Sequence, residues 1–263
     1  MISRRAAGIF DWSGVRLVAF DVDGTLYSQP RLRLRIAREM LIDVVIRQSL
    51  EAVAVVRAYR QIRERMAERE VADYEGSLMV ETARATRRLP ERVRGIVDEW
   101  IGRRPLRHLA ACRYPGALEL FAALRGNGNM IGIFSDYPAQ AKLDALGLRA
   151  DYIVCAADSG VGILKPNPRG LEVLMAAAGA TARQTVLIGD RADRDGAAAG
   201  RIGVRSLIRS ASAGKRQQTF ASFDDPIFRV FLQRPMMGPS PSAVNAQSSA
   251  AGAAAPRPIR TPC

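Results

Sequence analysis

The sequence predicts an α/β fold, in which a parallel sheet is flanked by helices and an all-helical segment is inserted after the first strand. From Pro115 onward, short apolar runs alternate with stretches of helical spacing. This pattern is typical of parallel strands joined by right-handed crossover helices. Before that point, residues 31–71 contain neither glycine nor proline and are rich in Arg, Glu, Ala and Leu, which favours helices.

The predicted elements follow in chain order. An apolar run over 15–20 predicts the first strand, and the apolar spacing within 31–71 predicts one long helix or two consecutive ones. A helix over 76–88 comes next, and another runs from Pro90 to Ile101 with proline in its first turn. Further helices are predicted over 116–125, 138–146, 168–178, 192–201 and 223–233. Strands are predicted at 130–134, 152–155, 185–189 and 203–208.

These elements divide the chain into two parts. Residues 11–30 and 114–233 form a discontinuous α/β core, and residues 31–113 form the helical insertion. Residues 234–263 are rich in Ala, Ser and Pro without periodicity, so this tail is predicted to be disordered.

The chain is strongly basic, with a formal net charge of +13 over 263 residues. Such a charge points to anionic partners or substrates. However, only Lys142, Lys165 and Lys215 are lysines, so 36 of the 39 basic residues are arginine. This skew is typical of a GC-rich genome, and nucleic-acid binding is therefore not predicted.

The three cysteines, Cys112, Cys155 and Cys263, are far apart and form no C-x-x-C pair. A disulfide framework or a zinc site is therefore not expected, and a reducing cytoplasm is the predicted location. The N-terminus lacks the apolar region of a secretory signal, and no apolar stretch is long enough to suggest a membrane span.

The first strand is followed directly by Asp21-Val22-Asp23-Gly24-Thr25-Leu26. Carboxylates two residues apart on an extended chain lie on the same side of it. Two like charges so close repel each other, so one carboxyl pKa should rise unless a cation neutralises the pair. The arrangement suits a hard divalent metal such as Mg2+, with one carboxylate as nucleophile and the other as proton carrier.

Three further polar groups stand where later apolar runs end. They are Ser135-Asp136, Lys165-Pro166-Asn167-Pro168, and Gly189-Asp190 with Asp193 and Asp195 close behind. In open α/β sheets, ligands bind in the crevice at the carboxyl ends of the strands. The four groups are therefore expected to meet at one site.

With these motifs the sequence resembles the haloacid dehalogenase-like (HAD) superfamily. The resemblance rests on DVDGTL at 21–26, the Ser of FSD at 135, the Lys of LKPNP at 165 and GDRADRD at 189–195, and it covers most of residues 15–210. It implies a Rossmann-like parallel sheet core with an inserted all-helical cap domain. An insertion after the first motif is similar to the phosphoglycolate-phosphatase-like subgroup.

The resemblance also implies a role for each motif residue. Asp21 would be the nucleophile, and Asp23 would protonate the leaving oxygen and then deprotonate water. Lys165 would neutralise charge in the transition state. The implied phosphate-binding residues are Ser135, Thr25 and Asp136. The implied Mg2+ ligands are Asp21, the backbone carbonyl of Asp23, and Asp190, with Asp195 in the outer shell.

The predicted function is that of a Mg2+-dependent phosphatase, which hydrolyses a small anionic phosphorylated metabolite through an aspartyl-phosphate. A dehalogenase would not need Asp23, and a phosphonate hydrolase would need a cap lysine, which residues 30–113 lack. A sugar-phosphate mutase remains an alternative, as does a non-catalytic protein that binds through the basic cap. Asp136 stands where many relatives have Asn, and its role, the substrate and the oligomeric state stay open.

Overall fold

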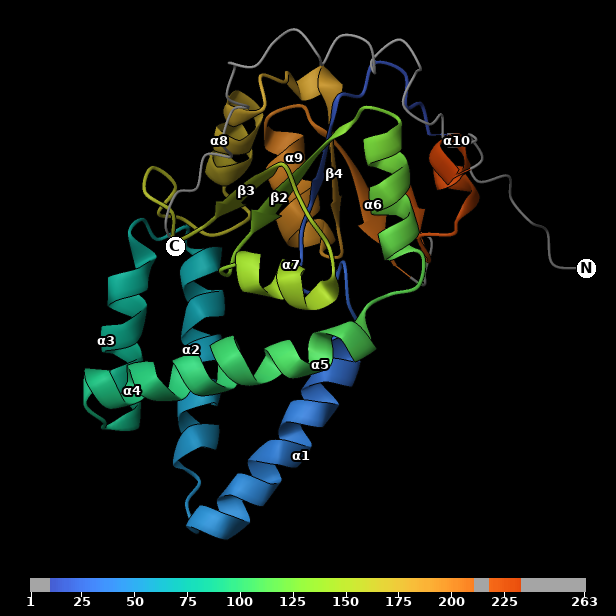
Figure 1. Ribbon diagram of the computed structural model, residues 1–263. Coiled ribbons are helices and arrows are strands. Elements are labelled where there is room, and N and C mark those ends of the chain that lie inside the picture. Colours follow the sequence, from blue (N-terminus) through green and yellow to red (C-terminus); the bar gives the residue numbers. More distant parts are fainter. Residues whose placement is uncertain (1–9, 211–217, 233–263) are drawn as a thin grey trace, which may run out of the picture.

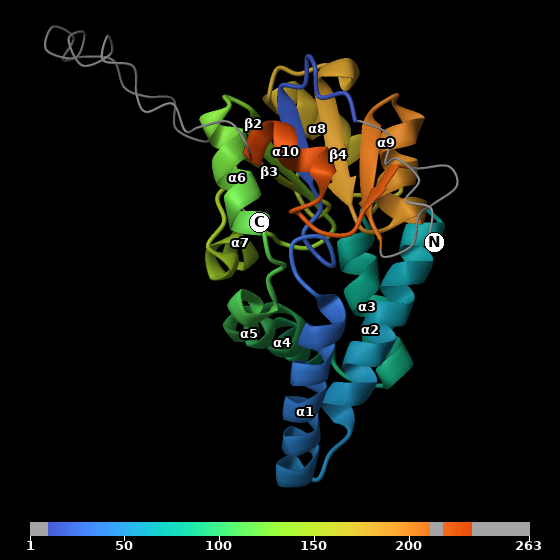
Figure 2. The same ribbon diagram turned by 90° about the vertical axis from the view of Figure 1, so that its right-hand side faces the viewer.

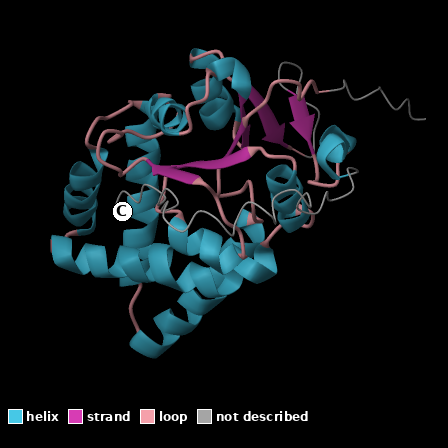
Figure 3. Ribbon diagram, turned by 45° about the horizontal axis from the view of Figure 1, so that its top comes forward, coloured by secondary structure: helices cyan, strands magenta, loops and turns pink. Residues whose placement is uncertain are grey.

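The computed structural model describes residues 10–210 and 218–232. Six parallel strands form one sheet in the order β3-β2-β1-β4-β5-β6, with helices packed around it (Figures 1 and 3). The strands are β1 (Leu17–Phe20), β2 (Met130–Ser135), β3 (Tyr152–Cys155), β4 (Thr185–Gly189), β5 (Arg205–Arg209) and β6 (Gln218–Phe220). From β1 the chain adds β2 and β3 on one side of the sheet and then β4, β5 and β6 on the other side. β1 and β4 therefore flank the crevice in which such sheets bind ligands.

The sheet is buried on both faces, as the nearly continuous apolar runs of its strands indicate. Side chains alternate along β1. Leu17 and Ala19 face one apolar cluster, and Val18 and Phe20 face another. The core helices that contribute to these clusters are α6 (Ala117–Gly126), α7 (Gln140–Leu146), α8 (Arg169–Ala177), α9 (Ala197–Arg201) and α10 (Arg229–Leu232), and the helices of the insertion continue the cluster that contains Val18 and Phe20. The α/β fold is therefore confirmed.

The inserted segment is helical throughout and lies beyond the carboxyl edge of the sheet (Figures 1 and 2). It contains α1 (Gln29–Arg47), α2 (Glu51–Glu68), α3 (Tyr74–Thr86), α4 (Pro90–Val97), a π-helical turn (Asp98–Arg103) and α5 (Arg104–Cys112). Residues 31–71 thus form two consecutive helices. The break falls at Gln48, whose left-handed φ of 50° ends α1.

Helical structure continues beyond the Ile101 end that the sequence predicts. The π-helical turn leads directly into α5, and Pro105 lies in the first turn of α5. The Arg104 amide still donates to the Glu99 carbonyl, five residues earlier, so Pro105, which has no N–H, lies where the helix changes from the π to the α pattern.

The two segments that join the insertion to the core are hydrogen-bonded to each other. The Ser28 amide donates to the Cys112 carbonyl at 2.9 Å, and the Tyr114 amide donates to the Leu26 carbonyl at 3.1 Å. The insertion therefore leaves and re-enters the core at one place, directly after the Asp21–Leu26 motif.

The C-terminal part of the core differs from the prediction in two respects. β6 is an unpredicted three-residue edge strand, and the helix expected over 223–233 is reduced to a 3-10 turn (Pro226–Phe228) and α10. The Asp225 carboxylate caps this turn by accepting the Ile227 amide at 3.1 Å. Helical structure therefore begins only at Pro226. The tail predicted over 234–263 lies outside the described residues.

A search of the described helices for a segment long and apolar enough to cross a membrane finds none.

Candidate active site

Asp21 follows β1 directly and lies at the centre of the site. Its amide donates to the Ile188 carbonyl at 2.9 Å, which continues the pairing of β1 with β4. Its carboxylate is buried and accepts hydrogen bonds from Thr25 Oγ1 at 3.0 Å and Lys165 Nζ at 2.5 Å. Burial raises the pKa of Asp21, and the nearby carboxylates raise it further, while Lys165 opposes the shift.

The turn after Asp21 passes close to β4. Gly24 has a φ of +95°, and a Cβ built on it would lie 2.1 Å from Asp190 Oδ2. Only glycine fits a left-handed backbone at this distance from another side chain. Gly24 therefore allows the first and last motifs to approach each other.

Lys165 is 3% exposed and joins three motifs. Its Nζ donates to Asp21 Oδ1, to Asp195 Oδ1 at 2.7 Å and to the Phe134 carbonyl at 3.2 Å. Burial alone would lower the pKa of Lys165, but the carboxylates of Asp195 and Asp21 raise it above its ordinary value. The ammonium group is therefore charged and placed beside the candidate nucleophile.

Three carboxylates form a group that could hold a metal ion. Asp21, Asp190 and Asp195 each offer an oxygen, and these oxygens lie within 4.8 Å of one another. Burial, followed by the charge of Asp195, raises the pKa of Asp190 to about 6. Hard oxygen donors that repel one another in this way suit a divalent cation such as Mg2+.

Asp195, expected in an outer shell, is 1% exposed and belongs to this group. Its Oδ2 accepts the amides of Asp190 at 3.2 Å and Arg191 at 3.0 Å, so its orientation is fixed by the loop that follows β4. Asp193, by contrast, is exposed and pairs with the Arg191 guanidinium at 2.8 Å.

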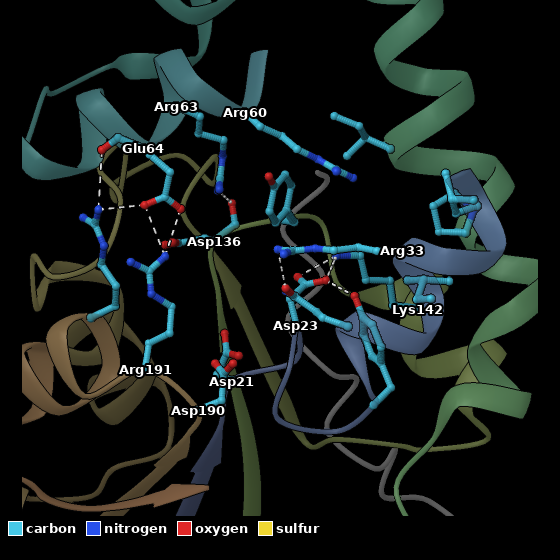
Figure 4. Close-up of a pocket in the computed structure, with 18 of the residues that line it drawn as sticks. Asp21, Asp23, Arg33, Arg60, Arg63, Glu64, Asp136, Lys142, Asp190 and Arg191 are labelled. Carbon is cyan, nitrogen blue, oxygen red and sulfur yellow. Dashed lines mark hydrogen bonds and ion pairs between the residues drawn. The ribbon is translucent and has the colours of Figure 1, made fainter. Parts of the chain in front are cut away.

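The Asp23 side chain points away from the three carboxylates (Figure 4). Both of its oxygens accept from Lys142 Nζ at 2.6 Å, and Tyr27 donates its hydroxyl to Oδ1. Burial opposes the charged form of Asp23, but the charge and hydrogen bond of Lys142 outweigh it, and the pKa of Asp23 lies below its ordinary value. The Asp23 side chain is thus separate from the candidate metal group.

Ser135 is the last residue of β2, which pairs with β1 on the side away from β4, and Asp136 follows it. Ser135 is fully buried, and its Oγ accepts the Tyr137 amide at 3.2 Å. The Asp136 carboxylate accepts the Lys165 amide at 2.9 Å, so it supports the loop that carries Lys165. This contact accounts for a carboxylate at a position where an anionic substrate would otherwise be repelled.

Four side chains of the site escaped sequence reasoning. Lys142 could have been noticed, because it is one of only three lysines and follows the Ser135 motif by seven residues. Arg63 and Glu64 on α2 and Arg194 after β4 carried no such signal, because the insertion and the core are both rich in charged residues. Their importance is visible only once α2 is placed against the core.

Arg63 and Glu64 connect the insertion to the site. The Arg63 guanidinium donates to the Asp136 carbonyl at 2.6 Å and lies 3.6 Å from the centre of the Tyr137 ring. Glu64 forms an ion pair with Arg191 at 2.9 Å (Figure 4). It forms a second ion pair with Arg194 at 2.9 Å, and Arg194 also donates to the Lys165 carbonyl at 3.0 Å.

A cavity of about 530 Å³ lies between the insertion and the carboxyl edge of the sheet. Asp21, Lys165, Asp190 and Asp195 line its core side, and residues of α1 and α2 line the opposite side. The structure therefore brings Asp21, Asp23, Asp136, Lys165, Asp190 and Asp195 to one cavity.

Sequence comparison finds a matching family model and a relative of known name. A family model described as haloacid dehalogenase-like hydrolase matches residues 15–203. A phosphoglycolate phosphatase of Rhodospirillum rubrum is 33% identical over 100 residues, which make up 37% of this chain and 41% of that protein. The chain thus matches about two fifths of the length of this relative.

Solved structures with the same fold include enzymes of different activities. The HAD-hydrolase YfnB of Bacillus subtilis, solved with bound magnesium, has a TM-score of 0.60 at 14% identity over 84% of this chain and 99% of that one. A 2-haloacid dehalogenase of Pseudomonas syringae pv. Tomato has a TM-score of 0.56 at 18% identity, covering 80% and 95%. A predicted phosphoglycolate phosphatase of Haemophilus somnus has a TM-score of 0.52 at 21% identity, covering 80% and 96%. At these identities the likeness concerns the fold alone.

Proposed function

The chain belongs to the haloacid dehalogenase-like hydrolase family, and from that premise we propose that it is a Mg2+-dependent phosphatase acting on a small phosphomonoester. The observation that carries the proposal is the contact of Asp21 with Lys165 beside the carboxylates of Asp190 and Asp195. This arrangement supplies a nucleophile, a fixed positive charge and a group of metal ligands within one cavity.

In the proposed reaction, a carboxylate oxygen of Asp21 attacks phosphorus and the ester P–O bond breaks. Asp23 gives its proton to the departing alkoxide, and an aspartyl-phosphate forms on Asp21. A water molecule then attacks the phosphorus and transfers a proton to Asp23, so that phosphate leaves and both carboxyl groups return to their starting states. Because Lys142 favours the ionised form of Asp23, Asp23 must first leave Lys142 and take up a proton from solvent, and it releases that proton when it returns to Lys142 after turnover.

Other residues would stabilise charge during both steps. Lys165, already beside Asp21, would neutralise negative charge that develops on the phosphoryl oxygens, and the Thr25 and Ser135 hydroxyls would donate to them. Mg2+ would be held by Asp21 and Asp190, together with the Asp23 carbonyl. Asp195 would either bind the ion as well or hold the other ligands in place. When bound, the ion would offset repulsion between the nucleophile and the phosphate.

Two observations favour a phosphatase over the other activities of the fold. Asp23 is present as a proton carrier, which a dehalogenase would not need. The phosphoglycolate phosphatase of Rhodospirillum rubrum also supports the assignment, although the match covers only 41% of that protein. A non-catalytic binding protein is a weaker proposal, because Asp21, Asp23 and Lys165 are all present. We further propose a cytoplasmic location, because the cysteines are far apart in the sequence and form no C-x-x-C pair.

The test is phosphate release from p-nitrophenyl phosphate by the purified chain. We expect turnover with Mg2+, none with excess chelator, and none in Asp21→Asn, a nearly isosteric change that removes the nucleophile. Beryllium fluoride, which mimics a phosphoryl group on Asp21, should inhibit the wild type. Asp144→Asn, the same change at an exposed residue of α7, is the control and should keep full activity. Near-normal turnover by Asp21→Asn would falsify the covalent mechanism.

A further inference from the structure

The cavity above the candidate active site changes character with distance from Asp21. Its core side is charged, whereas the far side carries apolar side chains of α1, α2 and the segment that leads into α5. These apolar lining residues are Leu32, Ile36, Ala37, Met40, Val56, Ile101 and Pro105. Leu32, Ile36 and Met40 recur every four residues, so α1 presents one apolar stripe to the cavity.

Neutral hydrogen-bonding side chains are scarce in this cavity. Within the described chain, those that line it are Tyr27, Gln29 and Tyr137. The Tyr27 hydroxyl donates to Asp23, the Gln29 side-chain carbonyl accepts from Arg33 at 2.7 Å, and the Tyr137 ring is covered by Arg63. A sugar that lay along the apolar wall would bury hydroxyl groups against carbon, which is unfavourable. The lining therefore argues against a sugar phosphate and, with it, against a sugar-phosphate mutase.

Arg60 lies between the apolar wall and the charged end of the cavity. It follows Val56 by one turn of α2 and precedes Arg63 and Glu64, and its guanidinium projects into the cavity (Figure 4). The Arg63 guanidinium already donates to the Asp136 carbonyl and lies on the Tyr137 ring, and Lys142 already donates to Asp23. Among the described residues, Arg60 has no ion-pair partner.

From these contacts we infer that the substrate is a phosphomonoester with an apolar carbon body and a second anionic group. This inference rests on the proposed phosphatase function. The phosphate would meet Asp21 and Lys165, and the carbon body would lie along Leu32, Ile36 and Met40. The second anionic group would meet Arg60, because an unpaired guanidinium binds carboxylate or phosphate oxygens through charge-assisted hydrogen bonds.

Four six-carbon phosphates separate the two features of this substrate. Hexyl phosphate and 6-phosphonooxyhexanoate have apolar bodies, without and with a carboxylate. Glucose 6-phosphate and 6-phosphogluconate are the hydroxylated counterparts. We expect kcat/KM to be highest for 6-phosphonooxyhexanoate, and about tenfold or more higher for each apolar compound than for its hydroxylated counterpart.

Variants of the cavity then test each contact. Arg60→Met should lower the ratio of kcat/KM for 6-phosphonooxyhexanoate to that for hexyl phosphate by about tenfold, the size expected for one charged hydrogen bond. Arg57→Met, an exposed arginine of α2 that does not line the cavity, is the matched control and should keep the wild-type ratio. Gln is similar to Met in length but is polar. Met40→Gln should therefore lower the ratio of kcat/KM for each apolar compound to that for its hydroxylated counterpart.

The outcomes distinguish this inference from the proposed function. If p-nitrophenyl phosphate is hydrolysed through Asp21 but the hydroxylated compounds are preferred, the inferred substrate class is wrong and the phosphatase assignment stands. An unchanged ratio in Arg60→Met would likewise overturn the assignment of the second anionic group. If the wild type hydrolyses none of the five esters, the proposed function fails and the inference fails with it.

Discussion

At the scale of single residues, the contact between Asp23 and Lys142 sets the charge of the proposed acid and base. Both Asp23 oxygens accept from Lys142 Nζ at 2.6 Å, and Lys142 is itself buried. Burial would raise the pKa of Asp23, and Lys142 contributes most to lowering it, with smaller contributions from Tyr27 and Arg63. Lys142 is therefore a positioning residue for the proposed proton transfer.

Lys142→Met should remove this charge while keeping most of the apolar stem. The pKa of Asp23 should then rise, because burial is no longer outweighed by a positive charge. Since Asp23 must be ionised to take a proton from water, the acid limb of the pH profile of kcat should move to higher pH. Lys215→Met, the same change at the remaining lysine that carries no predicted role, is the matched control, and the limb should stay in place. If the acid limb of the kcat profile stays at the same pH in Lys142→Met, Lys142 is not a positioning residue for Asp23.

Gly24 allows a second prediction at this scale. Gly24→Ala would place a Cβ 2.1 Å from Asp190 Oδ2, whereas Gly128→Ala meets no atom within 4 Å. Both glycines have left-handed φ angles, +95° and +81°, so both changes carry a similar backbone penalty of about 1–2 kcal/mol. Only Gly24→Ala should also displace Asp190 and weaken Mg2+ binding, which isothermal titration would measure. Equal Mg2+ affinity in the two variants would contradict the proposed metal site.

At the scale of elements, α2 connects the insertion to the core by ion pairs at its C-terminal end. Glu64 pairs with Arg191 and Arg194, and Glu70 beyond the end of the helix pairs with Arg201 at 2.7 Å. These contacts hold α2 over the proposed active site. Arg194 is buried, but the carboxylates of Glu64 and Glu70 are partly exposed, so these pairs contribute little to stability and their effect should appear in substrate binding.

Glu64→Gln should keep the shape of this side chain but remove its charge. We expect the free energy of unfolding to fall by less than about 1 kcal/mol, because the Glu64 side chain is 49% exposed and its ion pairs are screened by water. KM should rise severalfold, because without these ion pairs α2 is in place over the proposed active site for a smaller fraction of the time. Glu68→Gln, an exposed residue of the same helix, is the control, and equal KM values for the two variants would argue against closure by α2.

At the scale of the whole molecule, the buried carboxylates of the proposed metal site should link stability to Mg2+. An ion that binds the folded state alone stabilises it by about 2.7 kcal/mol at a concentration one hundred times its Kd. The added stability should be visible as a higher Tm in the presence of Mg2+. Asp190→Asn should lose most of this increase, because a neutral amide replaces a charged ligand.

The same stabilisation should depend on pH with a definite sign. Burial and Asp195 raise the pKa of Asp190 to about 6, so protons compete with Mg2+ for this carboxylate as the pH falls through that value. The increase in Tm caused by Mg2+ should therefore be fully present at pH 8 and should shrink toward pH 5. An increase that stays constant across this range would show that Asp190 does not bind the ion.

The sequence by itself determined the strands of the core, the helical insertion and the place of the four motifs. These features depend on local periodicity and on residues at strand ends, and the carboxyl ends of parallel strands must meet at one edge. Asp21, Lys165 and Asp190 could therefore be predicted as neighbours although they are far apart in the chain. The last helix and β6 were predicted poorly, because a three-residue edge strand and a capped turn carry little periodicity.

The tertiary structure alone decided which charged residues meet. Lys142 pairs with Asp23 across 119 positions, and Glu64 with Arg194 across 130, in a chain with 39 basic residues. Lys142 is distinguished only by the scarcity of lysine, and nothing local distinguishes Arg194 from the many other arginines of this chain. Their partners depend on how α2 packs against the core and how α7 packs within it. The same packing sets which side chains line the cavity. Substrate choice therefore belongs to the part of this protein that only the folded structure reveals.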